Sequence, residues 1–235
     1  MNIYKAITEE VLVPIHPAGW PFIFIFVVSS ILITMFWPPF ILPGVLLSLW
    51  CVYFFRNPVR TTPVTENFVV APADGRVLSI GEASPPEDLD LPDGEWRRVA
   101  IFMNVFDVHV NRAPVAGHVT ATSYHKGAFL NASLDKASEA NERQNIVMET
   151  SAGQLVGIVQ IAGLVARRIL LEAGAGDRLA VGQQFGIIRF GSRVDLWLPA
   201  STPVLVMPGQ RTVAGETIIA DLSGALVEPR DSRLS

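Results

Sequence analysis

The chain has 235 residues, of which 50% are hydrophobic and only 17% charged, and its formal net charge is −4. A soluble domain usually carries about 25% charged residues, so this composition is too apolar for an ordinary soluble protein or a disordered chain. The negative net charge provides no basic surface for nucleic acid, and the lone cysteine, Cys51, excludes an intrachain disulfide and a cysteine-built metal site.

The hydrophobic excess is concentrated near the N-terminus, where no charged residue occurs between Glu10 and Arg56. Two apolar runs, 20–36 and 40–55, are separated by Trp37-Pro38-Pro39. A helix needs about 20 apolar residues to cross a bilayer. The pattern therefore predicts a helical hairpin with a proline-rich turn, which either spans the membrane twice or dips in and returns. The alternative is a buried hairpin of a soluble protein, but so long a charge-free run rarely packs inside a small domain.

Positive residues flank this hydrophobic segment. Lys5 precedes it and Arg56 and Arg60 follow it, which favours both ends in the cytoplasm. Glu9-Glu10 and the absence of a small-residue cleavage site argue against a signal peptide. We therefore expect residues 1–56 to attach the protein to the inner cell membrane, with the remainder on the cytoplasmic side.

From residue 57 onward the pattern changes to short runs with period-two alternation, separated by Gly, Pro, Asp and Asn. Their regular spacing predicts a mainly β domain over 57–235, folded as a compact barrel or sandwich. The acidic, proline-containing segment 84–95 is interpreted as a surface loop, and the polar segment 132–143 as a short exposed helix or loop. The runs expected to form strands are 76–80, 99–103, 118–122, 145–150, 155–161, 168–171, 185–189, 194–198 and 204–207.

Candidate acid–base groups include four histidines, because an imidazole titrates near neutral pH. For each one alone, a structural or surface role is the commoner explanation. The sequence contains no His-x-His and no His-Glu-x-x-His, so we predict no metal site. The four are His16, His109, His118 and His125.

Two turn-like motifs also contain reactive residue types. Asp74 lies in Pro-Ala-Asp-Gly, which opens a predicted strand, and Gly191-Ser192 lies between two strand-like runs. Composition alone explains both as tight turns. The sequence has neither a Gly-x-Ser-x-Gly elbow nor a glycine-rich phosphate loop.

Six stretches in the same order resemble the phosphatidylserine decarboxylases of the short prokaryotic type. The resemblance covers nearly the whole chain, and six ordered stretches are far more specific than any one of them. They are the hydrophobic N-terminal pair, PADG (72–75), FMNVFDVHVNRAP (102–114), GAFLNASLDKASEANER (127–143), QIAGLVARRI (160–169) and VGQQFGIIRFGSRVDLWLP (181–199).

The chain departs from the longer bacterial branch of that family at two positions. That branch has Leu-Gly-Ser-Thr at its cleavage site, where this chain has Phe-Gly-Ser-Arg at 190–193. It also has two histidines three residues apart; here the first corresponds to His109, but the second position is Arg112. Whether His109 alone does what two histidines share elsewhere therefore stays open.

The resemblance implies that Ser192 attacks the carbonyl of Gly191 and cuts the chain into a β chain, 1–191, and an α chain, 192–235. Residue 192 then becomes a covalent pyruvoyl group, which forms a Schiff base with phosphatidylserine and accepts electrons as CO₂ leaves. Phosphatidylethanolamine is the product, and no added cofactor is needed. His109, oriented by Asp74, would be the base, as in Ser-His-Asp sites, although His125 is not excluded as an acid or base.

Four arginines in the matching stretches are candidates to bind the lipid phosphate through charge-assisted hydrogen bonds. Ordinary ion pairs or surface solubility are the alternative. The resemblance further implies a membrane substrate, contacts between the α and β chains of one precursor, and a possible homodimer. The four candidates are Arg167, Arg168, Arg189 and Arg193.

Other functions remain as alternatives. Archaeal relatives act on archaetidylserine, which has the same head group, so the residues do not separate the two substrates. A membrane-anchored serine peptidase using Ser192, His109 and Asp74 would leave its own chain intact. A lipoyl- or biotin-carrier barrel needs a lysine on a hairpin, which is not found, and a related metallopeptidase needs the missing His-x-His.

Overall fold

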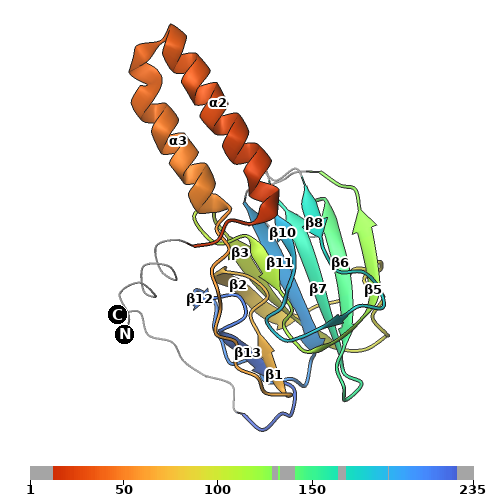
Figure 1. Cartoon of the computed structure of the whole chain (residues 1–235). Helices are drawn as coiled ribbons and strands as arrows, with labels where there is room; N and C mark the ends of the chain where they lie inside the picture. Colours follow the sequence, from red (N-terminus) through yellow and green to blue (C-terminus); the bar gives the residue numbers. More distant parts are fainter. Residues whose placement is uncertain (1–12, 129–131, 133–140, 164–167, 190, 227–235) are drawn as a thin grey trace, which may run out of the picture. The chain divides into compact units, whose positions relative to one another are not determined.

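The computed structural model describes residues 13–128, 132, 141–163, 168–189 and 191–226. The chain divides into two compact units, residues 1–59 and 60–235. The first unit contains the helices and the second contains the strands (Figure 1). Each unit is described by itself below.

The N-terminal unit is the predicted helical hairpin. A 3₁₀ turn, η2 (Pro17–Gly19), leads into α2 (Trp20–Phe36), and a second turn, η3 (Pro38–Phe40), leads into α3 (Ile41–Phe54). Pro38 and Pro39 lack the N–H groups that would continue α2, so the first helix ends before them. The proline-rich turn between the two apolar helices is therefore confirmed.

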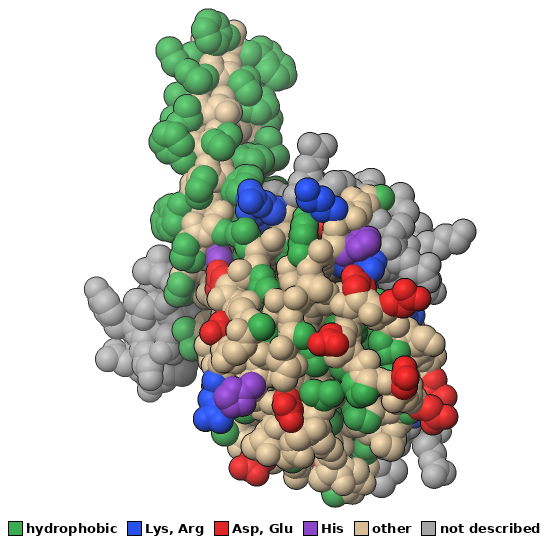
Figure 2. All heavy atoms as spheres, turned by 90° about the vertical axis from the view of Figure 1, so that its right-hand side faces the viewer, with side chains coloured by type: hydrophobic (Ala, Val, Ile, Leu, Met, Phe, Trp, Pro, Cys, Tyr) green, Lys and Arg blue, Asp and Glu red, His purple; other side chains and the backbone are tan. Residues whose placement is uncertain are grey.

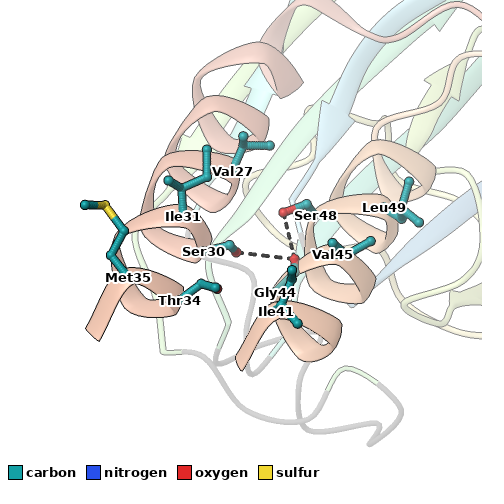
Figure 3. Close-up of a pocket in the computed structure, with 10 residues that line it drawn as sticks. All are labelled: Val27, Ser30, Ile31, Thr34, Met35, Ile41, Gly44, Val45, Ser48 and Leu49. Atoms are coloured by element: carbon teal, nitrogen blue, oxygen red, sulfur yellow. Dashed lines mark hydrogen bonds between the residues drawn. The ribbon is translucent and has the colours of Figure 1, made fainter. Parts of the chain in front are cut away.

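The two helices pack closely where a glycine faces a serine. The hydroxyls of Ser30 and Ser48 donate to the carbonyl oxygen of Gly44 at 3.3 and 2.8 Å (Figure 3). A Cβ atom on Gly44 would come within 2.8 Å of the Ser30 Cβ, so only glycine permits this approach. These contacts satisfy the serine hydroxyls inside an otherwise apolar hairpin.

On the face of the hairpin that Figure 2 shows, most side chains are hydrophobic. Phe24 is 69% exposed, Met35 72% and Phe36 88%. The stretch 17–36 is long and apolar enough to cross a membrane, and only 11% of its most apolar 18 residues are buried. A helix that is apolar on all its faces is stable only where its surroundings are also apolar.

The second unit is built from antiparallel strands, which confirms the predicted mainly β class. Its largest sheet curls like half a barrel and has the order β12-β2-β3-β11-β7-β6-β5-β9 (Figure 1). Smaller sheets have the orders β4-β10-β8 and β1-β13. The strands are β1 (Phe68–Val70), β2 (Gly75–Glu82), β3 (Trp96–Met103), β4 (Val110–Arg112), β5 (Gly117–His125), β6 (Arg143–Glu149), β7 (Leu155–Ala162), β8 (Ile169–Leu171), β9 (Arg178–Leu179), β10 (Gln184–Ile188), β11 (Ser192–Pro199), β12 (Arg211–Thr212) and β13 (Ile218–Asp221).

Strand β11 lies in the middle of the large sheet and is buried on both faces. Successive residues of a strand point to opposite faces. Val194, Leu196 and Leu198 therefore enter the main core, together with Val99, Ile101 and Ile158 from the two neighbouring strands. Trp197 enters a second cluster with Leu89 and Trp96, which covers the reverse face. Burial on both faces fixes the register of β11 and, with it, the position of Ser192.

Several details differ from the sequence prediction. Residues 204–207 are not a strand, because Pro203 and Pro208 flank them and only an isolated bridge joins Val204 to Ala220. The acidic segment 84–95 contains neither helix nor strand, as expected for a loop. Most of the segment 132–143 lies outside the described residues.

Candidate active site

Ser192 is the first residue of β11 and is completely buried. Its Oγ atom has no hydrogen-bond partner among the described residues. The preceding Gly191 has φ +63°, in the left-handed region that favours glycine. A Cβ built on Gly191 would meet no atom within 4 Å, so the requirement for glycine there is conformational rather than steric.

The carbonyl group of Gly191 packs directly against Gly163, which follows strand β7. A Cβ on Gly163 would overlap the Gly191 carbonyl oxygen and would lie 3.0 Å from its carbon. The same Cβ would be 3.3 Å from the side chain of Ala132, so it could not move aside freely. Gly163 therefore fixes where the carbonyl next to Ser192 can sit.

His109 immediately precedes β4 and is 1% exposed. The N–H of Gly191 donates to His109 Nε2 at 3.2 Å, and His109 Nδ1 lies 3.0 Å from the carbonyl oxygen of Asp107. These two partners assign the ring proton to Nδ1, which donates to Asp107. Nε2 is then the basic atom, and it contacts the N–H of the residue that precedes Ser192.

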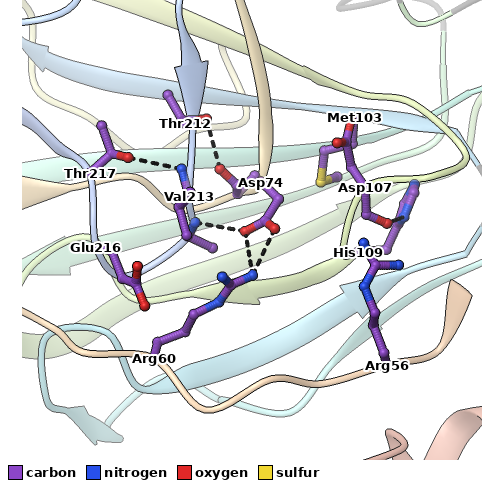
Figure 4. A network of polar contacts seen from close by, with 12 residues as sticks. Arg56, Arg60, Asp74, Met103, Asp107, His109, Thr212, Val213, Glu216 and Thr217 are labelled. Atoms are coloured by element: carbon purple, nitrogen blue, oxygen red, sulfur yellow. Dashed lines mark hydrogen bonds and ion pairs between the residues drawn. The ribbon is translucent and has the colours of Figure 1, made fainter. Parts of the chain in front are cut away.

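Asp74 precedes β2 and is held by a different set of contacts (Figure 4). Arg60 Nη2 donates to both carboxylate oxygens at 2.9 and 2.7 Å, and the N–H of Ala214 donates at 2.8 Å. Burial raises the pKa of the Asp74 carboxyl, and Arg60 and the Ala214 N–H offset part of that rise. The nearby charge of Asp107 acts in the same direction as burial.

The residue that replaces the second histidine of the longer branch remains close to this network. Arg112 Nη1 donates to the carbonyl oxygen of Gly182 at 3.0 Å. Burial is the main cause that lowers the pKa of Arg112, Arg60 adds to it, and Asp74 opposes it. The position therefore holds a guanidinium whose charge interacts with that of Asp74, in place of a second imidazole.

A family model described as phosphatidylserine decarboxylase matches residues 47–220. Three similar proteins are each named phosphatidylserine decarboxylase proenzyme. The one from Xanthobacter autotrophicus is 54% identical over 99% of this chain and 98% of its own length. Those from Nitrobacter winogradskyi and Beijerinckia indica are each 51% identical, over 88% and 94% of this chain and 84% and 94% of their own lengths.

The chain belongs to the phosphatidylserine decarboxylase family. The family resemblance in the sequence and the prediction of a carboxy-lyase are thereby confirmed. The relatives are named proenzymes, that is, inactive precursors of an active enzyme.

The arginines predicted to bind the lipid phosphate do not share one location in the decarboxylase. Arg193 is 1% exposed and its Nη2 pairs with Asp195 at 2.7 Å. Because neighbouring residues of a strand point to opposite faces, Arg193 lies on the face of the sheet opposite Ser192. The backbone N–H of Arg189 donates to the carbonyl oxygen of Arg168 at 3.3 Å, and burial lowers the pKa of Arg189. Arg167 lies outside the described residues.

The other histidines have structural contacts. His16 Nδ1 accepts from the Ala18 N–H at 3.2 Å at the start of η2, and His118 Nε2 lies 2.9 Å from Arg178. His125 Nδ1 lies 3.9 Å from Asp88. Within the described part of the chain, no group of three or more His, Cys, Asp or Glu side chains could hold a metal ion.

Three residues of the candidate site were not predicted from the sequence. The main-chain carbonyl of Asp107 contacts the imidazole, Arg60 contacts Asp74, and Gly163 contacts the Gly191 carbonyl. Asp107 lies two residues before His109, and this short spacing is the one signal that sequence reasoning could have used. Arg60 and Gly163 reach the site through tertiary folding alone.

Proposed function

We propose that the chain decarboxylates phosphatidylserine to phosphatidylethanolamine with a pyruvoyl group that it makes from Ser192. One observation supports this most directly: a fully buried serine hydroxyl without a described partner follows a left-handed glycine whose N–H contacts His109 Nε2. A serine peptidase would leave its own chain intact, so cleavage between Gly191 and Ser192 distinguishes the decarboxylase from that alternative. Archaetidylserine has the same head group as phosphatidylserine, so it stays an alternative substrate for the same reaction.

The making of the group needs only residues of this chain and water. Ser192 Oγ attacks the Gly191 carbonyl carbon, and His109 Nε2 takes the hydroxyl proton, because serine is a weak nucleophile without a base. An ester replaces the peptide bond as the Ser192 nitrogen is released. Loss of the Ser192 Cα proton breaks the Cβ–O bond and frees residues 1–191, and water then replaces the Ser192 nitrogen, which leaves as ammonia.

The residues around position 192 fit the ketone that this sequence of steps would leave. Position 192 is buried in the uncut chain, on the inner face of β11. No described group is hydrogen-bonded to Ser192 Oγ, so conversion of the hydroxyl would break no described hydrogen bond. When present, the group supplies the electron sink that decarboxylation requires. His109 would hold or deliver protons there, while Asp74 and Arg60 would set the charge around it.

Binding of the lipid is assigned to the remaining candidate features. Arg168 and Arg189 adjoin the cleavage site in the fold and could pair with the phosphate. The apolar hairpin would insert into the inner membrane, with Arg56 and Arg60 favouring a cytoplasmic location for the second unit. The substrate, which is itself a membrane component, would then be available at the same surface.

Replacing Gly163 with alanine is expected to prevent self-cleavage. The new Cβ would displace the Gly191 carbonyl, and a shift of about 1 Å in a reacting group costs on the order of 100-fold in rate. Gly81→Ala is the matched control, because a Cβ at Gly81 meets nothing within 4 Å. The measurement is the fraction of cut chain on a denaturing gel. Full cleavage of the Gly163→Ala chain would show that this packing does not position the carbonyl.

The proposed function as a whole is tested by trapping the lipid. Purified protein mixed with phosphatidylserine and borohydride is expected to carry the lipid covalently on the fragment 192–235, detected by mass spectrometry. Phosphatidylcholine, which has no primary amine, is the control and is expected to leave no adduct. Release of CO₂ from phosphatidylserine by an uncut chain that traps no lipid would reject the proposal.

A further inference from the structure

On the inner face of the large sheet, two buried side-chain atoms of the described residues lack a hydrogen-bond partner. They are Ser192 Oγ and Gln160 Oε1, and both residues are 0% exposed. Buried polar atoms are nearly always hydrogen-bonded, so each exception calls for an explanation. A hydroxyl can donate and an amide oxygen accepts, so the two atoms are chemically complementary.

The free end of the Gln160 amide is identified by its neighbour. Gln160 Nε2 donates to Asn111 Oδ1 at 2.7 Å, while Asn111 Nδ2 faces the Pro72 carbonyl oxygen at 3.4 Å and Met103 Sδ at 3.7 Å. A flipped Gln160 would set its oxygen against the Asn111 oxygen, and both atoms can only accept. Oε1 is therefore the end of the amide that the Asn111 contact leaves free.

Strand pairing places this amide and the Ser192 hydroxyl on one face of the large sheet. Ser192 lies opposite Ala162 on β7, and Gln160, two residues away on the same strand, projects to the same face. Such diagonal neighbours have Cα atoms about 7–8 Å apart, within reach of a long side chain. Met103, which contacts Asn111, lies directly opposite Ser192 on β3.

Strand β4 and the residue before it bring His109 close to Asn111, which holds the Gln160 amide. Asn111 follows His109 by two residues, so the two side chains project to the same side of an extended segment. His109 contacts the Gly191 N–H, while Asn111 holds Gln160. Gly186 on β10 gives the amide room, since a Cβ there would come within 3.4 Å of Gln160 Nε2.

We propose that Gln160, held by Asn111, is a positioning residue for self-cleavage. The two atoms are not bonded to each other in this structure; when the side chains turn toward each other before the reaction, Oε1 accepts the hydrogen of the Ser192 hydroxyl and so orients Oγ toward the Gly191 carbonyl. In the step itself, the Oγ–carbon bond forms and the carbon–nitrogen bond breaks. As Oγ attacks, its hydrogen leaves Gln160 Oε1 and passes to His109 Nε2, which releases the Gly191 N–H, and the proton then passes to the released Ser192 nitrogen. This inference rests on the proposed function, because it requires that Ser192 cleaves the chain.

The test is a double-mutant cycle on the rate of self-cleavage, with chains freshly made by cell-free translation in the presence of lipid vesicles. Gln160→Leu is expected to slow cleavage roughly tenfold, about the effect of one lost hydrogen bond. In a Ser192→Cys chain the same substitution is expected to have almost no effect, because a thiol is a stronger nucleophile and only a weak hydrogen-bond donor. A purely structural role would slow both nucleophiles equally.

Gln144→Leu is the matched control for this cycle. Gln144 is a buried glutamine directly opposite Gln160 on β6, one strand further from Ser192, and its loss is expected to leave the cleavage rate unchanged. Thermal unfolding of Ser192→Ala chains with and without Gln160→Leu checks the fold. If Gln160→Leu does not fold, Gln160→Met, which matches the length of glutamine, replaces it.

The outcomes separate this inference from the function on which it rests. Equal slowing in the Ser192 and Ser192→Cys chains, or no slowing in either, would overturn the positioning role of Gln160. A wild-type chain that is never cut would instead reject the proposed function. Slowing confined to the Ser192 chain would support both.

Discussion

Replacing Ser192 with alanine is expected to abolish self-cleavage, so that the protein stays as one chain of 235 residues. The wild-type chain is expected to yield two fragments, 1–191 and 192–235, with the second blocked at its N-terminus. Alanine lacks the hydroxyl that attacks the Gly191 carbonyl, and no other described group occupies that position. Intact-mass spectrometry of the purified proteins distinguishes the two results.

The alanine variant is expected to fold. Ser192 makes no described side-chain hydrogen bond, so its removal leaves no partner unsatisfied. Ser79→Ala, on strand β2 of the same sheet, is the control and is expected to be cut normally. A wild-type chain that decarboxylates at full rate while remaining uncut would reject the pyruvoyl mechanism outright.

The long helices and strands were predictable because each contains a long run of apolar or alternating residues. The hairpin has two apolar runs separated by prolines, and the long strands, such as β7 and β11, include extended apolar or alternating segments. Strands β1 and β13 have only three and four residues, which is too short to establish a period. They form because Val69 pairs with Ala220 across a separation that no local pattern reveals.

The site was predictable only where its residues lie in matching stretches. The structure brings the Gly191 N–H to His109 Nε2, beside Ser192 in the chain, and the catalytic roles of these residues stay predictions. Asp74 is anchored by Arg60, and the ring Nδ1 of His109 faces a main-chain carbonyl instead. Every residue type has a main-chain carbonyl, so only the two-residue spacing of Asp107 and His109 could have indicated this contact.

One assignment depended on where the strand begins. The predicted strand started at residue 194, but β11 begins at Ser192, so the adjacent side chains of Ser192 and Arg193 point to opposite faces. Arg193 forms a buried ion pair with Asp195 on the reverse face. Because removing one partner of such a pair costs about 3–5 kcal/mol, a loss of activity on mutating Arg193 would report on folding before it reported on lipid binding.

Replacing His109 with alanine is expected to slow self-cleavage by at least about 100-fold, the usual contribution of a general base. Its Nε2 is the basic atom that accepts from the Gly191 N–H, in the residue whose carbonyl Ser192 attacks. The rate is measured as the appearance of the 1–191 fragment over time. His118→Gln, on strand β5, is the control and is expected to be cut at the wild-type rate.

His109→Gln separates proton transfer from positioning. A glutamine amide can still accept from the Gly191 N–H and donate toward the Asp107 carbonyl, but it cannot take a proton at neutral pH. If His109 is the base, His109→Gln is expected to be as slow as His109→Ala, and added imidazole should restore part of the rate to the alanine variant. If the His109→Gln variant were cut at the wild-type rate, His109 would only hold the turn at Gly191. Another residue of the site would then have to be the base.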